Sequence, residues 1–400
     1  MKQQTSAVVE PAVKVKISRT FSNQPLCVGL DVHKMRWQVA VVDDGFLLSN
    51  ASIAAGFDHL MHHLHKRYPG VNFRFAYESG PFGYTLCRQL QQAGFECLVV
   101  NPADIPGTDK DRKNKRDHTD ARRLADNLSD GRLRGVYIPS PSEAKHRSLI
   151  RFRKRLWGDL VRCKNRLKGE LLFQGIIIPA QYDNAHWSHN FLAWIQVVAR
   201  QDEELGVTLL LMLEEVRALR QLLLKTEQAL RDMMRSARYR DNANLLRSIP
   251  GIGPLTTMLI LLEIGDTRRF ASFDHLNSFV GLCPDSHQSG DTHRPQGLTG
   301  RRHNLLRSAL IESSWQTIRQ DPAMYQAYRQ LCTRMKGQEA ITRIARRLLR
   351  RVRAVLITQQ PYLIGNDGSV PTSQLIIPDM PMPKKKGRPV KNTTNSHGLP

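Results

Sequence analysis

Short apolar runs alternate with amphipathic stretches in the first third of the chain. Four of the runs have the composition and length of buried strands: residues 26–32, 36–42, 72–77 and 96–100. Three stretches have helical periodicity: residues 51–68, residues 84–93 and a segment that begins near Asp117. Strands that alternate with helices predict an α/β domain over residues 25–141, and the unpatterned residues 1–24 are expected to form a flexible basic arm.

From residue 142 the apolar positions recur at three- and four-residue steps, which predicts a helical region over residues 142–240. The helix at 142–171 is expected to pack on one face and to present Arg and Lys on the other. In residues 205–233 the steps of four and three alternate strictly, as in a coiled-coil seam within one chain or between chains. An amphipathic helix in a bundle gives the same pattern, so both interpretations stay open here.

A third region, residues 241–360, is expected to be mainly α-helical. Its helices are predicted at residues 242–249, 255–264, 273–280, 304–318, 323–335 and 338–357, with a long loop at 283–303. Residues 361–400 lose this periodicity and are expected to form a disordered basic tail.

The first two of these helices flank Pro250-Gly251-Ile252-Gly253-Pro254, which resembles the turn of a helix-hairpin-helix element. In such a turn, Gly251 and Gly253 let backbone N–H groups approach a nucleic-acid phosphate without reading its sequence. A tight helix–helix turn with no ligand is the alternative.

The charge of the chain narrows the class of partner. Lys and Arg number 59 against 36 Asp and Glu, which gives a formal charge of +23. The cations recur along the whole chain, and their mutual repulsion favours a polyanionic partner, so nucleic acid is expected. Candidate phosphate contacts on the basic helix are Arg151, Arg155, Arg162 and Lys164. Arg388 lies in a Lys-Lys-Lys-Gly-Arg-Pro stretch that resembles a minor-groove AT-hook, with a solubilising tail as the alternative.

Other features exclude several classes of protein. The hydrophobic fraction of 41% is enough for true cores, but no apolar stretch is long enough to span a membrane. The start of the chain has no apolar core of a secretory signal. The six cysteines are scattered without zinc-ligand spacing. A reduced cytosolic protein without a membrane partner is therefore expected.

Four acidic residues have the placement of a metal site. Asp31 and Glu78 end two predicted strands, and Asp117 and Asp120 lie three residues apart at the start of a helix. An acid at the end of a buried strand is costly unless a cation meets it. Carboxylates suit Mg²⁺, and two Mg²⁺ ions can stabilise the attacking and leaving oxygens of a phosphodiester. Taken singly, Asp117 as an N-cap and Asp120 as a helix-dipole partner are structural alternatives.

The order of these motifs resembles the DEDD transposases of a large family of bacterial insertion sequences. The N-terminal motifs are Gly29-Leu30-Asp31-Val32-His33-Lys34, Tyr77-Glu78-Ser79-Gly80-Pro81 and Lys115-Arg116-Asp117 followed by Asp120-Ala121. Motifs similar to the family's C-terminal transposase domain are Pro250-Gly251-Ile252-Gly253, Glu263-Ile264-Gly265-Asp266, Arg269-Phe270, Gly281-Leu282, Pro284 and Ser289-Gly290. The resemblance covers about residues 25–357. It departs at Arg116 and Gln288, where the family usually has Thr and Ser.

The resemblance implies an N-terminal domain like the RuvC Holliday-junction resolvase, with a ribonuclease-H-like fold. It implies that Asp31, Glu78, Asp117 and Asp120 bind metal, with two Mg²⁺ ions expected. It also implies that Ser289 attacks DNA and forms a transient phosphoserine link. Fallback nucleophiles are Ser286 and Thr292, and candidate bases are His287 and His293.

The same resemblance implies the partners. The protein is expected to act on donor and target DNA with an element-encoded non-coding RNA as guide. It is expected to work as a homo-oligomer, a dimer or tetramer, in the bacterial cytoplasm and near the nucleoid. The expected architecture is thus an α/β RuvC-like domain, a helical coiled-coil linker and a mainly α C-terminal domain with a helix-hairpin-helix-like element.

Two other functions stay open at this point. One is a RuvC-like Holliday-junction endonuclease, in which water attacks and Ser289 plays no part. The other is a non-catalytic nucleic-acid scaffold whose acids are structural. Substitution of Asp31 or Ser289 discriminates between the three functions.

Overall fold

The computed structural model describes residues 24–106, 117–183, 187–289, 292–299 and 302–364, with the backbone alone at 117–118 and 284–298. The predicted arm, most of the tail and Arg388 lie outside these residues. The chain divides into two compact units, residues 1–140 and 141–400, which are described separately below. In the described part of the chain, no helix is both long and apolar enough to cross a membrane.

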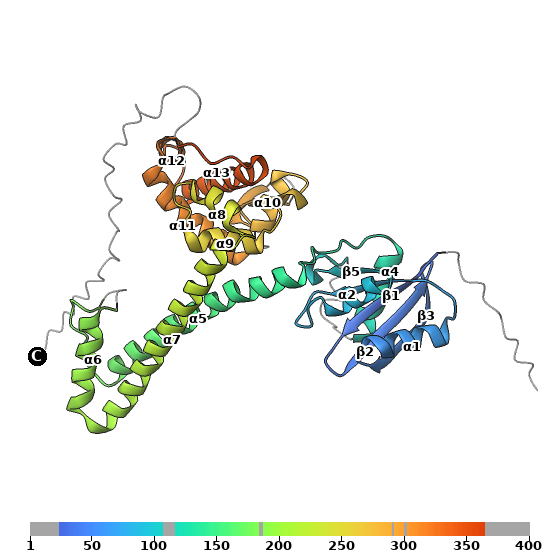
Figure 1. Ribbon diagram of the computed structural model, residues 1–400, viewed down its shortest axis with the longest axis horizontal. Helices are drawn as coiled ribbons and strands as arrows, with labels where there is room; N and C mark the ends of the chain where they lie inside the picture. Colours follow the sequence, from blue (N-terminus) through green and yellow to red (C-terminus); the bar gives the residue numbers. More distant parts are fainter. Residues whose placement is uncertain (1–23, 107–116, 184–186, 290–291, 300–301, 365–400) are drawn as a thin grey trace, which may run out of the picture. The chain divides into compact units, whose positions relative to one another are not determined.

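A five-stranded sheet forms the centre of the first unit (Figure 1). Its strands are β1 (Leu26–Val32), β2 (Arg36–Asp43), β3 (Phe46–Ala54), β4 (Phe73–Glu78) and β5 (Glu96–Val100). The order across the sheet is β3-β2-β1-β4-β5. The first three strands are antiparallel neighbours, whereas β4 and β5 run parallel to β1. This mixed sheet is consistent with the ribonuclease-H-like fold that the resemblance implies.

Helices cover both faces of this sheet. The helices of the unit are α1 (Phe57–Arg67), α2 (Thr85–Gln92), the short η1 (Pro102–Asp104) and α4 (Asp117–Ser129). Apolar residues of α1 and α2 pack with Leu30 and Phe75 in one core. Leu124 and Leu128 of α4 pack with Ala76 in another core, on the opposite face of the sheet. Helices α1 and α2 therefore pack on one face of the sheet, and α4 packs on the other.

The third strand corrects one prediction. Residues 51–54 belong to β3 and not to a helix, which begins only at Phe57. Asp44 and Gly45, both at positive φ, form the turn between β2 and β3. Because β3 lies at the sheet edge and most of its side chains are partly exposed, it lacks the continuous apolar run of a buried strand. Its polar residues concealed it from the sequence pattern.

Gly29 allows α4 to approach β1 closely. A Cβ atom at this position would lie 2.1 Å from the Ala121 carbonyl oxygen and 2.5 Å from the Ala125 nitrogen. We therefore expect Gly29→Ala to lower the free energy of unfolding by about 2–3 kcal/mol, because neither backbone atom can move without shifting α4. Denaturant unfolding monitored by circular dichroism measures this. Gly80→Ala is the control, since its Cβ would meet only the Glu78 carbonyl oxygen at 4.0 Å, and an equal loss in both variants would contradict the explanation.

A helical arm forms the first part of the second unit. It comprises α5 (Pro141–Phe173), α6 (His189–Gln201) and α7 (Glu203–Arg235). Arg153 of α5 pairs with Glu227 of α7, and Arg166 pairs with Glu215. The pair with the higher residue number on α5 has the lower residue number on α7, so the two helices run antiparallel. The apolar stripe of α7 is therefore buried within one chain, against α5 and the unpredicted α6.

The rest of the second unit is a helical bundle with a small β-hairpin. Its elements are α8 (Arg240–Arg247), α9 (Pro254–Glu263), η2 (Thr267–Arg269), α10 (Phe273–Val280), β6 (Pro284–Ser289), β7 (Thr292–Leu298), α11 (Asn304–Gln320), α12 (Pro322–Cys332) and α13 (Gly337–Thr358). Apolar residues of its helices form a single core around Ile260 and Leu348. The predicted helices of this region are confirmed within a few residues.

The hairpin corrects a second prediction, since the segment 283–303 was expected to be a loop. β6 and β7 pair in antiparallel register, with Ser289 opposite Thr292 and His287 opposite Arg294. The segment has hardly any apolar residues, so no alternating pattern indicates strands. Backbone pairing across a turn, which does not depend on side-chain hydropathy, forms this element.

Candidate active site

Two of the predicted acids lie side by side at one edge of the sheet. Asp31 and Glu78 follow the paired residues Leu30 and Tyr77 of the parallel strands β1 and β4. Both acids are two residues beyond positions that face α4, Gly29 on β1 and Ala76 on β4. Side chains alternate between the two faces of a strand, so both carboxylates lie on the α4 side of the sheet.

A third acid comes from α4 on that same side. The side chain of Asp120 is buried, and its Oδ1 lies 3.5 Å from Arg123 Nη2. The same Arg123 Nη2 lies 3.6 Å from Glu78 Oε1, so one guanidinium lies between the two carboxylates. Asp120 Oδ2 is buried without a hydrogen-bond partner among the described residues. An orphaned carboxylate oxygen in this position fits a bound cation.

Asp31 and Glu78 are both partly exposed, unlike the buried Asp120. The Oδ2 atom of Asp31 lies 3.1 Å from Nε2 of His33, which follows the end of β1. Asp117 begins α4, one helical turn before Asp120, but its side chain lies outside the described residues. Among the side chains that are described, no three of His, Cys, Asp and Glu are close enough to hold an ion. The donor set on the α4 face is nevertheless carboxylate oxygen, as Mg²⁺ prefers.

Ser289 is the last residue of β6 in the second unit. It pairs with Thr292, so the hairpin reverses direction immediately after it. Ser286 pairs with Pro295, further from the turn. Side-chain positions of these residues and of His287 and His293 are not described. The backbone alone places Ser289 at the end of β6, next to the turn of the hairpin.

The base of this hairpin is fixed to the bundle. Thr299 N–H donates to the Cys283 carbonyl oxygen at 3.2 Å, which closes the hairpin. Asn277 of α10 donates to Cys283 Sγ at 3.0 Å, and Arg307 of α11 donates to the Thr299 carbonyl oxygen at 3.1 Å. The hairpin is therefore held between α10 and α11 at both of its ends.

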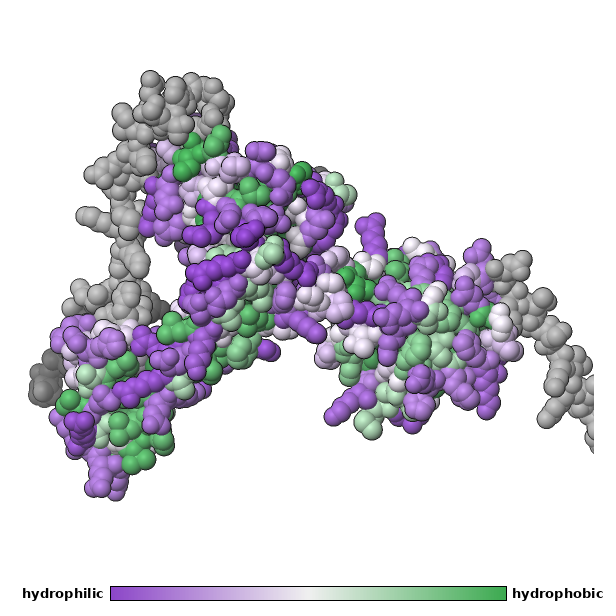
Figure 2. Space-filling view, viewed as in Figure 1, coloured by the Kyte–Doolittle hydropathy of each residue, from purple (hydrophilic) through white to green (hydrophobic). Residues whose placement is uncertain are grey.

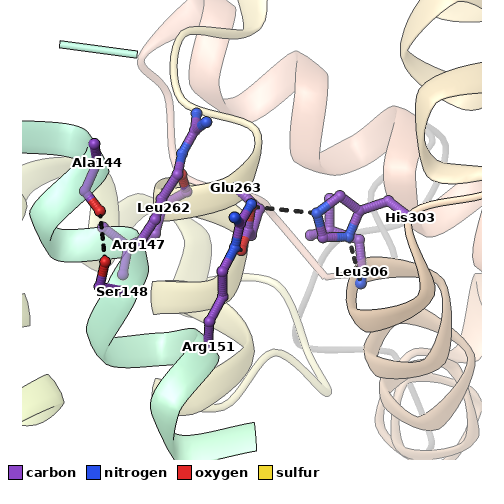
Figure 3. A network of polar contacts seen from close by, with 8 residues as sticks. All are labelled: Ala144, Arg147, Ser148, Arg151, Leu262, Glu263, His303 and Leu306. Atoms are coloured by element: carbon purple, nitrogen blue, oxygen red, sulfur yellow. Dashed lines mark hydrogen bonds and ion pairs between the residues drawn. The ribbon is translucent and has the colours of Figure 1, made fainter. Parts of the chain in front are cut away.

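A buried ion pair supports the same region (Figure 3). The carboxylate of Glu263, at the end of α9, is almost completely buried and accepts two hydrogen bonds of 2.7 Å from Arg151 of α5. Its Oε2 also lies 3.2 Å from Nε2 of His303, which immediately precedes α11. His303 Nδ1 accepts from the Leu306 N–H, so the ring proton resides on Nε2 and donates to Glu263.

This contact network predicts a pH dependence. Burial alone would raise the pKa of Glu263, but the hydrogen bonds from Arg151 and His303 outweigh it and lower the pKa from 4.5 to about 2. A lowered native pKa stabilises the fold above the unfolded value, so stability is expected to fall as the pH drops from about 4.5 toward 2. We expect Glu263→Gln to lower the free energy of unfolding by about 3 kcal/mol at neutral pH. The variant should also lose less stability than wild type as the pH drops below about 4.5.

Unfolding midpoints between pH 2.5 and 7 test the Glu263 prediction. The control is Glu215→Gln, which removes an exposed ion pair with Arg166 on the arm and should leave the midpoint nearly unchanged. If the stability of Glu263→Gln fell with pH as steeply as that of wild type, another group would be responsible for the pH dependence.

Curated relatives share long stretches with this sequence. The transposase-like protein y4qE of Sinorhizobium fredii is 27% identical over 304 residues, 74% of this chain and 72% of that protein. The transposase for insertion sequence element IS1533 of Leptospira borgpetersenii is 27% identical over 267 residues, 64% of this chain and 74% of that protein. The pilin gene-inverting protein of Moraxella bovis is 37% identical over 128 residues, 30% of this chain and 38% of that protein.

Two family patterns match the chain at the sites described above. The DEDD pattern, described as Transposase, matches residues 28–174, which include Asp31, Glu78 and Asp120. The pattern described as Transposase IS116/IS110/IS902 family matches residues 243–329, which include Glu263 and Ser289. The chain belongs to the IS110 family of DEDD transposases. Membership implies an enzyme that acts on DNA and uses a divalent metal.

The two glycines of the turn at residues 250–254 of this transposase have different surroundings. Gly251 has a φ of +87°, and a Cβ there would lie 2.5 Å from Thr317 Oγ1 of α11 and 2.6 Å from the Ser313 carbonyl oxygen. Gly251 is thus required for packing against α11. Gly253 is exposed, precedes α9 and has nothing within 4 Å of its Cβ position. Of the two, Gly253 is the one whose backbone is open to a phosphate.

The basic helix of the transposase presents most of its predicted cations. Arg151 is engaged by Glu263, whereas Arg155 is exposed beside Phe152. Arg162 is exposed and pairs with Asp159, one turn earlier. Lys164 lies 5.3 Å from the Trp187 ring centre, and burial, with Arg220 nearby, lowers its pKa.

Two residues of these networks, Arg123 and His303, were not predicted from the sequence, nor was the burial of Glu263. Arg123 follows Asp120 by three positions, a spacing that places both on one face of α4, and this signal was available. His303 and the burial of Glu263 had no local signal, because their partners lie 40 and 112 residues away along the chain.

Proposed function

We propose that this transposase cuts and rejoins DNA strands by phosphodiester transesterification, with two Mg²⁺ ions held by Asp31, Glu78, Asp117 and Asp120 and with Ser289 as nucleophile. The observation that carries the metal site is the buried, unpartnered oxygen of Asp120 on the face of the sheet that bears Asp31 and Glu78. Donor and target DNA are the substrates, and an element-encoded non-coding RNA selects them.

The residues have separate tasks in this reaction. The four carboxylates hold the ions, and Arg123 keeps Glu78 and Asp120 oriented toward each other. When bound, Mg²⁺ stabilises the negative charge on the attacking and leaving oxygens. Ser289 Oγ loses its proton and attacks phosphorus, so that a phosphoserine ester forms and a strand hydroxyl leaves with a proton. A hydroxyl of the other DNA then attacks this ester, which rejoins the strands and restores the serine.

The exposed side of α5 supports the proposed RNA partner. The exposed cations Arg155 and Arg162 lie on the same helix as the exposed aromatic rings of Phe152 and Trp157, a combination that suits phosphates together with unstacked bases.

The far end of the arm supports a homo-oligomer, a dimer or tetramer. Figure 2 shows apolar residues on its surface there. The exposed members are Leu172, Phe173, Ile177, Val207 and Leu211. A large exposed apolar patch is typical of a protein interface.

A covalent-trapping experiment tests the function. The full-length protein is incubated with labelled DNA carrying the element's ends, the element's own transcript and Mg²⁺, and denaturing gels detect protein joined to DNA. An adduct that requires both Mg²⁺ and the transcript is expected. Mg²⁺-dependent cutting without any adduct would instead indicate the junction endonuclease, which the acids of the first unit could support without Ser289. Binding without cutting would indicate the scaffold.

A further inference from the structure

The last helix of the bundle has two chemically opposite faces. Its buried face is aliphatic and includes Ile344, Leu348 and Val352. The other face carries arginines at three- and four-residue steps: Arg343, Arg346, Arg347, Arg350 and Arg351. Residues at these steps are neighbours on the helix surface, so five guanidinium groups project from one side of α13.

These arginines line a hollow of about 570 Å³ between α12 and α13. Arg334, two residues beyond α12, adds a sixth guanidinium, and the remaining wall is Leu331 and Ala354. Among the described residues, no Asp or Glu lines the hollow. Two of the six charges are paired with carboxylates beside the hollow, and the other four repel each other, which costs stability unless an anion enters.

Part of this arginine cluster is held in place by the bundle. Arg346 pairs with Asp274 at 3.0 Å, and Arg351 pairs with the buried Asp321 at 2.5 Å. Arg350 lies 4.7 Å from the ring centre of Phe273, and Arg351 lies 4.7 Å from that of Tyr362. These contacts fix three of the guanidinium groups before any ligand binds, which lowers the entropy cost of binding.

Four arginines of the cluster are available to a ligand, including Arg350, whose described contact is with an aromatic ring. Arg334, Arg343, Arg347 and Arg350 are exposed, and none has an ion pair with a described carboxylate. Guanidinium groups bind phosphate oxygens through paired, parallel hydrogen bonds. We propose that this hollow between α12 and α13 binds the phosphates of a nucleic-acid backbone, as a second contact region apart from the acidic site and the basic helix α5.

This inference rests on nucleic acid as the partner in the proposed function. Salt-dependent binding tests it, because each lost phosphate contact lowers the slope of log Kd against log salt by about 0.9 on duplex DNA. The variant is Arg343→Gln with Arg347→Gln in the full-length protein. Both side chains are exposed and form no ion pair with a described acid, so the fold should survive, and thermal melting checks this. The matched control is Arg329→Gln with Lys336→Gln, which removes two exposed charges outside the hollow.

Fluorescence anisotropy without Mg²⁺ measures Kd for a labelled DNA duplex and for a labelled RNA between 50 and 300 mM KCl. At 100 mM salt we expect the variant to bind on the order of tenfold more weakly, with a slope on DNA lower by about 2, and the control to bind like wild type. A loss restricted to DNA or to RNA identifies which backbone occupies the hollow.

Two results would overturn the inference. Equal binding by the variant and the control would remove the hollow as a phosphate site while leaving the recombination chemistry untouched. A wild-type protein that binds neither nucleic acid would reject both the hollow and the proposed function. Arg343→Lys with Arg347→Lys keeps both charges, so its salt slope should match wild type if the effect is electrostatic.

Discussion

Replacing Asp31 by asparagine should abolish DNA cleavage and strand exchange by this transposase while leaving DNA binding unchanged. Asparagine has nearly the same shape but no charge, so one ligand of the proposed metal site would lose most of its affinity for Mg²⁺. Metal stabilisation of a phosphodiester transition state amounts to several kcal/mol, which corresponds to a loss of roughly a thousandfold or more in rate. Cleavage of labelled DNA at saturating transcript measures the effect, and Asp120→Asn should have a similar result.

Asp44→Asn is the matched control for Asp31→Asn. Asp44 lies in the turn between β2 and β3, next to the end of β2 that pairs with the start of β1, and thus at the other end of β1 from Asp31. It loses the same charge, and asparagine tolerates its positive φ. The control should cleave DNA like wild type. If Asp31→Asn also cleaved at the wild-type rate, the acids would be structural and the metal site would be wrong.

Most of the first unit could be predicted from sequence because its strands are buried on both faces. The expected runs at 26–32 and 96–100 coincide with β1 and β5. In such strands nearly every residue is apolar, so an acid such as Asp31 is conspicuous against its neighbours. The edge strand β3 and the polar hairpin β6–β7 have no such contrast, and both were missed.

The site was predictable only where its residues stand out locally. Asp31, Glu78 and the pair Asp117 and Asp120 could be selected by position at strand or helix ends, and the structure brings three of them to one face. The position of Arg123 between two acids depends on how closely α4 packs on β1, which in turn depends on the missing side chain of Gly29. Such tertiary contacts have no periodic signature in sequence.

The number of cations on a helix does not show how many of them are free to bind a partner. A count of cations pointed to the long helix α5, yet Arg151 and Arg153 of that helix are bound to Glu263 and Glu227 within the fold. The face of α13 has a comparable density of arginines, and four members of its cluster lack such partners among the described residues. Net charge therefore indicates the class of partner, whereas internal ion pairs decide which cations remain for it.

Replacing Ser289 by alanine should remove the covalent protein–DNA adduct and strand exchange, with no change in the affinity for DNA or RNA. The hydroxyl is the proposed attacking group, and alanine has no substitute for it, so the covalent step should fall to the background of the trapping assay. The fold should be unaffected, because Ser289 ends β6 at the tip of the hairpin and its backbone pairing with Thr292 does not need the side chain. The assay is the same denaturing gel, together with anisotropy for binding.

Ser286→Ala is the matched control for Ser289→Ala, since Ser286 lies on the same strand but further from the hairpin turn. It should form the adduct at the wild-type level. If Ser286→Ala lost the adduct and Ser289→Ala kept it, the nucleophile would be the other serine and the remainder of the mechanism would stand. If Ser289→Ala still cut DNA at the undiminished Mg²⁺-dependent rate, water would be the nucleophile. The acids of the first unit would then act as a junction-type nuclease, and the hairpin would position DNA without reacting with it.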